Sequence, residues 1–338
     1  MINIGLIGAG RIGRIHAEIM ARHVTGAKIT MAAEAFANRE TEEWANAVGI
    51  PVLTKDYHEI LDSPEVDAVM ICSSTDTHTQ IIGEAAAAGK QIFCEKPISY
   101  DIDQILEALR LVKKYGVALQ IGFNRRFDHN FKKVRDMVAA GKIGDVQIVK
   151  ITSRDPAPPP VSYIKVSGGI FLDMMIHDFD MARYLSGSEV EEVYARGAVL
   201  VDPEIGKAGD VDTAIVTLKF ANGAIGVIDN SRQAVYGHDQ RVEVFGSGGC
   251  LTAGNDTESS VDYYAPDGRI SDNPIRPFRV RYEAAYANEV QAFVDAVSGK
   301  GEPPVDGWDG LQPILIGLAA TESMKTGLPV TVRKYQKI

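Results

Sequence analysis

Two residues near the middle of the chain have the spacing of an acid–base pair. Asp173 and His177 are four residues apart, so on a helix they lie on one face, and Asp180 continues that stripe at i+7. A carboxylate one turn before an imidazole can orient the ring and stabilise its charged form, as a general base near neutral pH requires. The alternative is a pair on a helix surface that takes no part in chemistry.

A lysine in the first third of the chain stands where a cation could act on a ligand. Lys96 follows an apolar strand-like run, residues 91–94, and ligands of open α/β sheets bind outside the carboxyl ends of such strands. There an ammonium group would stabilise negative charge that develops on an oxygen. Pro97 restricts Lys96 to extended conformations and could adopt a cis bond, which would fix the direction of the side chain. A surface lysine at a strand exit is the alternative.

Other polar residues could contact a small ligand. Arg125 and Arg126 come just after the last parallel strand-like run, while Asp155 and Tyr236 lie on segments expected to be loops. The arginines could hydrogen-bond a substrate or pair with acidic residues across a domain interface. For Asp155 and Tyr236, a role in binding and a purely structural role both remain open.

The first twenty residues predict a nucleotide site. An apolar strand, residues 2–7, leads into Gly8-Ala9-Gly10-Arg11-Ile12-Gly13, and residues 14–20 have helical spacing. Strand, G-x-G-x-x-G turn and helix form the context of a dinucleotide-binding site. The first glycine permits the tight turn, the second lets the backbone approach a pyrophosphate, and the third lets helix and strand pack closely. The N–H groups at the start of the helix then face the phosphates.

An acidic residue after the second strand favours NAD over NADP. Residues 28–33 form a β-prone run that ends at Glu34, near the spacing at which a carboxylate accepts hydrogen bonds from both adenosine ribose hydroxyls. A site for NADP would favour a small residue with an adjacent arginine. Here Ala35 and Phe36 follow, and Arg39 is the nearest cation. NADP is therefore disfavoured.

The elements that must position these residues fall into two groups. Strand-like and helical runs alternate through the first third of the chain, as in a doubly wound parallel sheet. The strands expected there are 2–7, 28–33, 52–53, 66–72, 91–94 and 117–121, and the helices 39–48, 77–88 and 102–115. Beyond them, helices are expected at about 130–140, 170–185, 284–297 and 310–324, with antiparallel-type strands such as 213–220 between them. We expect an α/β protein with an N-terminal doubly wound parallel Rossmann domain (1–122) and a C-terminal α+β domain with a mostly antiparallel open sheet (123–338).

Length and composition are those of a two-domain globular protein. The chain has 338 residues, more than one ordinary core holds, and its net charge of −10 without a basic run argues against nucleic acid and anionic membranes as partners. No apolar stretch is long enough to cross a bilayer. The three widely spaced cysteines form neither a disulfide framework nor a C-x-x-C pair, so a reducing cytoplasm is expected. None of the seven histidines has metal-ligand spacing, and no metal is expected.

Over nearly its whole length the chain resembles the glucose–fructose oxidoreductase/inositol dehydrogenase/rhizopine-catabolism family. The shared framework is the glycine turn at 8–13, the Glu-Lys-Pro run at 95–97 and the Gly-Gly-x-x-x-Asp-x-x-x-His run at 168–177. More specific segments are GFNRRFD at 122–128, SRDPAPPP at 153–160, YIKVSGGIFLDMMIHDFDMARYL at 163–185 and YGHDQRVEVFGS at 236–247.

The resemblance implies NAD-dependent oxidation of a secondary hydroxyl of a cyclic polyol, with myo-inositol converted to 2-keto-myo-inositol (scyllo-inosose). It implies a homotetramer built through the second-domain sheets, and it implies that Lys96, Asp173 and His177 form the catalytic group. The implied cofactor-binding residues are Gly8, Ala9, Gly10, Arg11, Ile12, Gly13, Glu34, Ser73, Ser74, Thr75, His78, Glu95 and Lys96. The implied substrate-binding residues are Lys96, Arg126, Asp155, Asp173, His177, Asp180 and Tyr236.

Two departures from the family pattern affect the cofactor site. Glu34 replaces the more usual aspartate, so its longer side chain must fold back to reach the ribose. Ser73 and Ser74 stand where many relatives have Thr-Pro, just before residues 75–78, which should border the nicotinamide ribose. Both departures leave the cofactor geometry open.

Three other functions remain open. The chain could be a dehydrogenase for scyllo-inositol or a pyranose, an enzyme that retains its cofactor while two sugars exchange, or a noncatalytic NAD or sugar sensor. The joint presence of Lys96, Asp173 and His177 argues against a sensor, which need not keep a proton-transfer pair. The enzyme assignment depends on the expectation that Lys96 and His177 act on the same alcohol, facing the nicotinamide ring.

Overall fold

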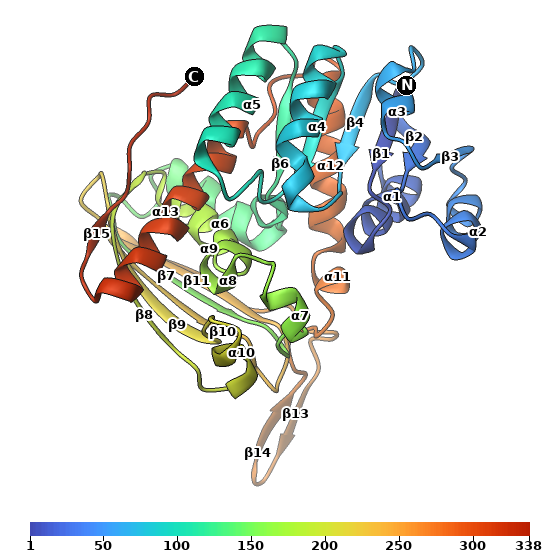
Figure 1. Ribbon diagram of the computed structural model, residues 1–338. Coiled ribbons are helices and arrows are strands. Elements are labelled where there is room, and N and C mark those ends of the chain that lie inside the picture. The colour runs from blue at the N-terminus through green and yellow to red at the C-terminus, as the bar shows by residue number, and fades with distance from the viewer. The chain divides into compact units, whose positions relative to one another are not determined.

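The computed structural model describes residues 1–338, which form two compact units. Unit 1 holds Met1–Phe127, Glu283–Leu311 and Gln336–Ile338, and unit 2 holds Asp128–Tyr282 and Gln312–Tyr335. These units differ from the expected ranges 1–122 and 123–338, because a late segment of the chain returns to unit 1 (Figure 1).

Unit 1 is built on a six-stranded sheet with the order β3-β2-β1-β4-β5-β6, and every strand pair is parallel. The strands are β1 (Ile2–Ile7), β2 (Ala27–Ala33), β3 (Val52–Thr54), β4 (Ala68–Ile71), β5 (Gln91–Glu95) and β6 (Leu119–Gly122). The helices are α1 (Arg11–His23), α2 (Arg39–Val48), α3 (His58–Asp62), α4 (Thr75–Ala87), α5 (Ile102–Tyr115) and the 3₁₀ helix η1 (Asn124–Phe127). This strand order is that of the doubly wound Rossmann fold and confirms the prediction.

Helix α12 (Glu283–Val297) is the late segment that completes the core of unit 1. Its apolar residues Val290, Phe293 and Val294 recur at i, i+3 and i+4, so they form one stripe. All three are buried in the same cluster as Phe93 of β5. Burying one such side chain stabilises a fold by about 1.5–3 kcal/mol, so this helix contributes strongly to the sheet that it covers.

Unit 2 contains an open seven-stranded sheet with the order β12-β11-β7-β10-β9-β8-β15. Its one parallel pair is β7 with β10, so the predicted mostly antiparallel sheet is confirmed. The strands are β7 (Val146–Arg154), β8 (Val190–Ala198), β9 (Thr213–Phe220), β10 (Ile225–Ser231), β11 (Asp239–Gly246), β12 (Gly249–Ala253) and β15 (Val330–Thr331), and a separate hairpin has β13 (Asp262–Ala265) and β14 (Gly268–Ser271). The helices are α6 (His129–Ala139), α7 (Val161–Ile164), α8 (Gly169–Asp173), α9 (Ile176–Ser186), α10 (Pro203–Lys207), α11 (Phe278–Arg281) and α13 (Gly307–Thr326), whose first residues belong to unit 1.

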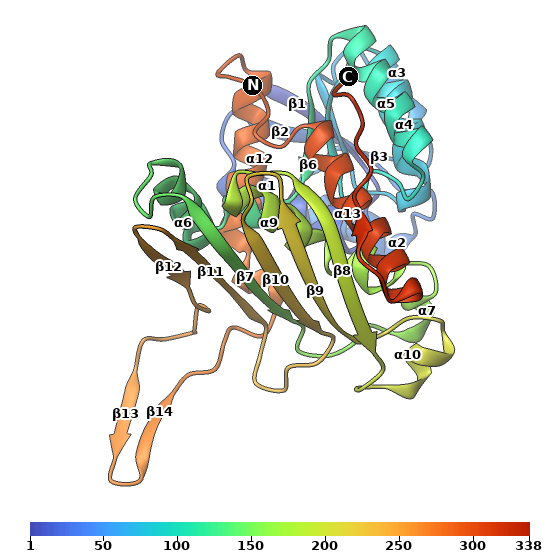
Figure 2. The ribbon, with the colours of Figure 1, turned by 90° about the vertical axis from the view of Figure 1, so that its left-hand side faces the viewer.

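The seven-stranded sheet carries helices on one face, where Figures 1 and 2 show α6 and α9. Strand β9 shows why, because its residues alternate between buried and exposed as the sequence predicts. The buried ones are Ala214, Val216, Leu218 and Phe220. The β13–β14 hairpin extends beyond the sheet (Figure 2).

The segment that carries the Asp–His pair is two helices, α8 and α9, rather than the single helix expected. The carbonyl oxygen of Ile170 accepts hydrogen bonds from the N–H groups of both Met174 and Met175, at 3.2 and 2.8 Å. The second bond spans five residues rather than four, so the turn is one residue wider and the regular helix stops. The prediction of one helix is therefore wrong: Asp173 ends α8, and His177 lies in the first turn of α9.

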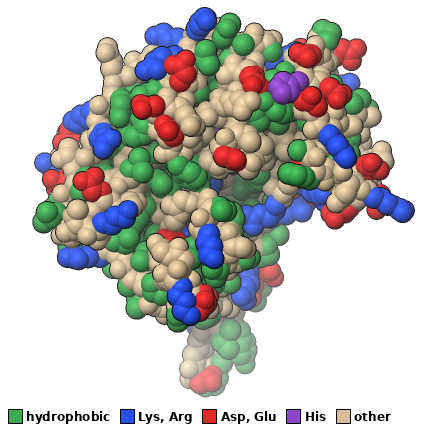
Figure 3. Space-filling view, in the orientation of Figure 1, with side chains coloured by type: hydrophobic (Ala, Val, Ile, Leu, Met, Phe, Trp, Pro, Cys, Tyr) green, Lys and Arg blue, Asp and Glu red, His purple; other side chains and the backbone are tan.

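The surface mixes charge and apolar groups. No helix combines the length and the hydropathy that a membrane span needs. Over the face seen in Figure 3, acidic and basic side chains are intermingled rather than gathered by sign. Large exposed apolar side chains of unit 2 lie on the hairpin and on the sheet, and they include Tyr263, Tyr264, Ile270, Ile215, Ile225 and Phe245.

Candidate active site

The glycine turn joins the end of β1 to the start of α1 and has no room for side chains at two of its glycines. Gly8 has a φ of +94°, and a Cβ there would lie 2.6 Å from the backbone nitrogen of Ser73. A Cβ on Gly13 would lie 2.0 Å from the carbonyl oxygen of Gly8. At Gly10, by contrast, a Cβ would meet nothing within 4 Å. The turn therefore has no space on the side of the sheet, but it has space at Gly10, the residue that precedes α1.

Residues around this opening fit an adenine dinucleotide. No side chain caps α1 at Gly10, and helix N-termini of this kind bind phosphates. The Glu34 carboxylate folds back to the turn, where its Oε2 accepts a hydrogen bond from Ala9 N at 2.9 Å and its Oε1 accepts one from Phe36 N at 3.2 Å. Each oxygen retains a lone pair with which it can accept a ribose hydroxyl. The glycine turn, the N-terminus of α1 and the Glu34 carboxylate thus lie together, as the sequence predicts.

A short hydroxyl-rich segment follows β4. The Ser73 Oγ lies 2.7 Å from the Thr77 Oγ1, which donates a hydrogen bond to the Ser74 carbonyl oxygen at 2.8 Å. Ser73, Ser74 and Thr75 are all at least partly exposed, so they are available to a ligand at the carboxyl edge of the sheet.

His78 differs from this segment because its side chain is turned inward. It is 1% exposed, with Nδ1 2.8 Å from the Pro97 carbonyl oxygen and Nε2 3.1 Å from that of Ser73. Burial lowers the pKa of His78. The ring therefore ties the loop after β4 to Pro97, whose peptide bond with Lys96 is cis. This geometry gives the ring a structural role within the segment that is expected to border the nicotinamide ribose.

Lys96 lies directly after β5, as expected, and is partly exposed, whereas Glu95 is buried. The Glu95 Oε1 lies 2.7 Å from Nε2 of His16 on α1, and its Oε2 accepts the Lys96 N–H at 3.2 Å. His16 is fully buried between the edges of two aromatic rings, those of Phe93 and Tyr286. Sequence reasoning missed His16, although a polar residue on the buried face of α1 was an available signal. Glu95, expected to contact the cofactor, therefore links the lysine strand to the dinucleotide-binding helix.

Arg126 lies in η1 and makes an ion pair within unit 1. Its Nη2 lies 3.0 Å from Oδ1 of Asp309, and its side chain is only 10% exposed. The sequence left open a pairing with acidic residues across a domain interface, but this partner lies in the same unit. Here it occurs with a residue that returns late in the chain, near the start of α13.

In unit 2, the Asp–His pair is singled out by its exposure. From Ile170 to Arg183, Asp173 and His177 alone are not fully buried. Their neighbours anchor the segment in the core, and the wide turn between α8 and α9 leaves both polar groups accessible. Asp180, expected to contact substrate, is 1% exposed and lies 4.0 Å from the guanidinium of Arg183.

Asp155 follows β7 and has a histidine neighbour that sequence reasoning missed. Its Oδ1 lies 3.4 Å from Nε2 of His238, a ring that is 5% exposed and packs edge-on against Tyr282. Nε2 of His238 also lies 3.0 Å from the Gln240 amide nitrogen. The Asp155 side chain is one-third exposed, so it combines a buried support with access to solvent.

Tyr236 lies on the loop between β10 and β11 and donates a hydrogen bond from its hydroxyl to Asp239 Oδ2 at 2.6 Å. Burial and this hydrogen bond raise the pKa of Tyr236. Burial raises the pKa of Asp239, but hydrogen bonds from Arg241, Tyr236 and Asn255 outweigh that effect and lower the pKa to about 2. The tyrosine is therefore held by a carboxylate that stays ionised at neutral pH.

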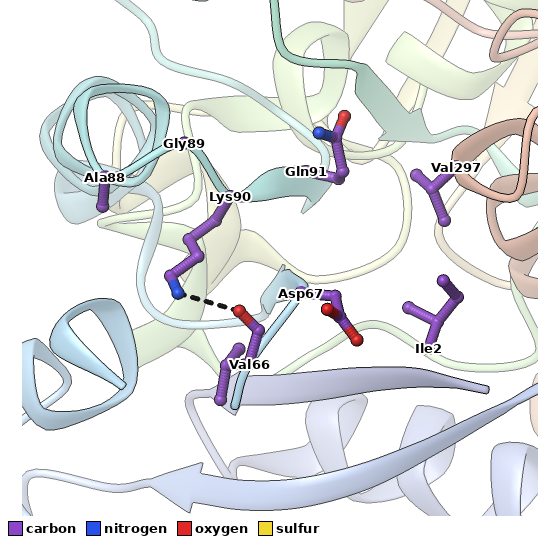
Figure 4. Close-up of a pocket in the computed structure, with 8 residues that line it drawn as sticks. All are labelled: Ile2, Val66, Asp67, Ala88, Gly89, Lys90, Gln91 and Val297. Atoms are coloured by element: carbon purple, nitrogen blue, oxygen red, sulfur yellow. Dashed lines mark hydrogen bonds between the residues drawn. The ribbon is translucent and has the colours of Figure 1, made fainter. Parts of the chain in front are cut away.

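Figure 4 shows a groove in unit 1 that is lined by eight residues, among them Lys90 and Val297. Its lining includes Ile2, Asp67 and Gln91, which stand at the amino ends of β1, β4 and β5. The ammonium group of Lys90 donates hydrogen bonds to the carbonyl oxygens of Ser63 and Val66, at 2.6 and 2.8 Å. This groove is therefore not the dinucleotide site, which belongs at the carboxyl edge.

Three side chains of metal-ligating type meet near the start of α6: Asp128, His129 and Asp256. The Arg281 guanidinium lies 2.6 Å from the Asp128 carboxylate and 3.0 Å from the Asp256 carboxylate. This buried cation already offsets part of the negative charge on which a metal ion would depend. The cluster is an ion-pair network in which Asp128 and Arg281 are buried, Asp256 is partly exposed and His129 is exposed.

Two family matches cover most of the chain. Residues 2–123 match the oxidoreductase family with an NAD-binding Rossmann fold. Residues 131–252 match the GFO/IDH/MocA C-terminal domain. The first match contains the glycine turn, Glu34 and Lys96, and the second contains Asp173 and His177.

Full-length relatives have related names. A myo-inositol 2-dehydrogenase of Thermotoga maritima is 50% identical over 96% of this chain and 96% of its own length. An inositol 2-dehydrogenase of Rhizobium meliloti is 45% identical over 96% of this chain and 97% of its own. Among solved structures, scyllo-inositol dehydrogenase from Lactobacillus casei with bound NAD(H) and scyllo-inositol has a TM-score of 0.91 and 31% identity, covering 98% of this chain and 99% of that chain.

Proposed function

The chain belongs to the GFO/IDH/MocA family of NAD-binding oxidoreductases, and on that premise we propose that it oxidises myo-inositol to 2-keto-myo-inositol (scyllo-inosose). The names of the relatives at 50% and 45% identity support this substrate. Within the chain, the observation that carries the proposal is that Asp173 and His177 alone are partly exposed in an otherwise buried segment. An acid–base pair that a ligand can reach is what alcohol oxidation needs.

When bound, NAD supplies the acceptor for the hydride that leaves the hydroxyl-bearing carbon. His177 takes the hydroxyl proton at a ring nitrogen, and Asp173 orients the ring and stabilises its charged form. Lys96 donates a hydrogen bond to the same oxygen and stabilises the negative charge that develops there. Loss of one proton and one hydride converts the secondary alcohol to a ketone.

The binding residues are assigned by the same proposal. The turn at 8–13 and Glu34 hold the adenosine and pyrophosphate. Ser73 and Ser74 also contact the cofactor, and residues 75–78 border the nicotinamide ribose. Asp155 and Tyr236 contact the polyol, because both are partly exposed and rigidly supported. Asp180, which is buried, and Arg126, which is ion-paired, complete the set of residues assigned to the polyol.

Oxidation of scyllo-inositol is a second candidate, and the structural relative that binds this isomer favours it. Inositol isomers differ in the orientation of single hydroxyl groups, so the positions of a few polar side chains decide between them. Absorbance at the NADH band separates the candidates when NAD is mixed with myo-inositol, scyllo-inositol, chiro-inositol or glucose. Fastest reduction with myo-inositol is the expected result. No turnover with any of them would contradict the proposal and favour a sensor, and NAD that copurifies tightly would favour sugar exchange.

Substitution of His177 tests the mechanism. We expect His177→Ala to lower kcat by about 10²–10⁴-fold, because the general base is lost, while the affinity for NAD is unchanged. His129→Ala is the control, since that ring is also in unit 2 and its side chain is 65% exposed. A His177→Ala enzyme with the kcat of the unsubstituted protein would contradict the assignment of the base.

Assembly as a homotetramer in the cytoplasm is part of the proposal. Ile225, Ile148 and Phe245 are in register across β10, β7 and β11, and the first and last are exposed, so they form an apolar row on the sheet. Such a row is typical of a surface that a second copy covers. Reducing conditions would keep the three cysteines free. Light scattering should give the mass of four chains, and Phe245→Glu should lower it.

A further inference from the structure

A buried arginine in unit 2 pairs with the carboxylate to which the mechanism assigns the orientation of His177. Arg232 directly follows β10 and is only 1% exposed. Its Nη1 lies 3.6 Å from Oδ2 of Asp173, and its Nη2 lies 3.3 Å from Oδ2 of Asp210. A guanidinium is buried at this depth only when carboxylates compensate its charge, so the three groups depend on one another.

Asp210 holds the other end of helix α8. Its Oδ1 accepts a hydrogen bond from the Ile170 N–H at 3.1 Å, near the start of the helix that Asp173 ends. The approach requires a glycine, because a Cβ on Gly169 would lie 2.9 Å from this oxygen, and its φ is +80°. The second glycine of the Gly-Gly run thus has a physical role: it admits the carboxylate that anchors α8.

The second oxygen of the Asp173 carboxylate also has a donor. The Tyr163 hydroxyl donates a hydrogen bond to Asp173 Oδ1 at 2.8 Å. The two carboxylate oxygens therefore face different cationic or hydroxyl partners, from the end of β10 and from α7. This support matters because the wide turn at Met174 and Met175 interrupts the helix that would otherwise hold Asp173 against α9.

We propose that Arg232 and Asp210 are positioning residues that fix the Asp173 carboxylate for its work on His177, with Tyr163 as a third support. The inference rests on the proposed function, since it assigns Asp173 the orientation of the base. Arg232 sets the place and charge of one oxygen, Asp210 balances the guanidinium and anchors the helix start, and Tyr163 limits rotation of the carboxylate. The buried arginine thus acts on catalysis through Asp173 and contacts no substrate itself.

Kinetics of Arg232→Met and Arg232→Lys test this inference, with the fastest polyol and with kcat calculated per folded molecule. We expect Arg232→Met to lower kcat about 10- to 100-fold with little change in the KM for NAD, and Arg232→Lys to recover part of the loss. Arg281→Met is the matched control, because Arg281 is equally buried in unit 2 and pairs with Asp128 and Asp256 instead. A purely structural role would lower the melting temperature of both Met variants and leave both kcat values unchanged, which would overturn the inference.

Tyr163→Phe keeps the test decisive if the arginine variants do not fold, because Tyr163 is 42% exposed. We expect it to lower kcat about 3- to 10-fold at an unchanged melting temperature, whereas Tyr194→Phe, which removes the hydroxyl that accepts from Arg196 on the sheet, should not. Crystal structures of Arg232→Lys and Tyr163→Phe give a readout that is independent of activity. A displaced Asp173 carboxylate supports the inference even if no polyol is oxidised, and an unmoved carboxylate with unchanged kcat overturns it.

Discussion

The glycine turn of unit 1 and the α8 segment of unit 2 place functional groups by opposite physical means. The turn works through backbone atoms of neighbouring residues, packed so closely that Gly8 and Gly13 have no space for a Cβ. The α8 segment works through side-chain charges from distant parts of the sequence, with Arg232 between Asp173 and Asp210. An added side-chain atom should therefore disrupt the structure of the turn, whereas removal of a charge should disrupt the structure of the α8 segment.

This difference also separates stability from function. In the turn, crowding at Gly13 concerns the fold, while the open position at Gly10 concerns the ligand. In unit 2 the same ion pairs that hold the backbone also hold the functional carboxylate, so a single substitution affects both.

Adding one methyl group to the turn should have the largest effect on stability. We expect Gly13→Ala to lower the free energy of unfolding by about 3 kcal/mol, because its Cβ would lie 2.0 Å from the Gly8 carbonyl oxygen. Gly10→Ala should change that free energy by less than about 0.5 kcal/mol, yet weaken NAD binding because its Cβ enters the opening. Chemical denaturation and titration of NAD by calorimetry measure the two effects. Equal loss of stability in both variants would contradict the division of roles within the turn.

Removing a buried charge from unit 2 should have a somewhat smaller effect, and one that depends on pH. The pKa of Asp239 is about 2 in the folded chain and 3.8 without its partners, so the folded state is stabilised above pH 3.8 and loses that stabilisation as the pH falls toward 2. Asp239→Asn should lower the free energy of unfolding by about 2 kcal/mol at pH 7 and by less at pH 3. Denaturation at both pH values measures this, with Asp267→Asn, in the exposed hairpin turn, as the control. If the difference in free energy of unfolding between Asp239→Asn and the unsubstituted protein is as large at pH 3 as at pH 7, packing rather than charge accounts for it.

The smallest predicted effect concerns His78 in unit 1. Because burial lowers the pKa of His78, its contribution to stability is fully present above the unfolded value of 6.5 and is lost as the pH falls through the lower folded value. The free energy of unfolding should therefore fall below pH 6.5, by at most about 1.4 kcal/mol per pH unit for this one group. His78→Asn should flatten that dependence, whereas His129→Asn should not. Parallel pH profiles for the unsubstituted protein and His78→Asn would disprove the effect.

Two helices with signals at both ends were predicted to the residue. Helix α2 begins after Asn38, whose side chain accepts the Thr41 N–H, and ends at Gly49 in the left-handed conformation. Helix α5 has the same kind of ends in Asp101 and Gly116. Capping residues act within a few positions of the helix end, so sequence alone contains the information.

Features that depend on distant partners were not predictable in the same way. Periodicity predicts α12 but not the sheet on which it packs, so the expected domain ranges omit its return to unit 1. The wide turn after Asp173 has no local signal, because the methionines that form it favour a regular helix. The pairing of Arg232 with Asp173 has no local signal either. An arginine after a strand is usually exposed, and only the fold brings this one to Asp173.

The return of α12 has a consequence for biosynthesis. A ribosome releases the six strands of unit 1 long before residues 283–297. The apolar surface around Phe93 therefore stays uncovered while all of Asp128–Tyr282 is translated. A nascent chain in that interval exposes the kind of surface that chaperones bind and that promotes aggregation. The first unit can therefore finish folding only after most of the second has emerged, which couples the quality control of the nucleotide half to that of the other half.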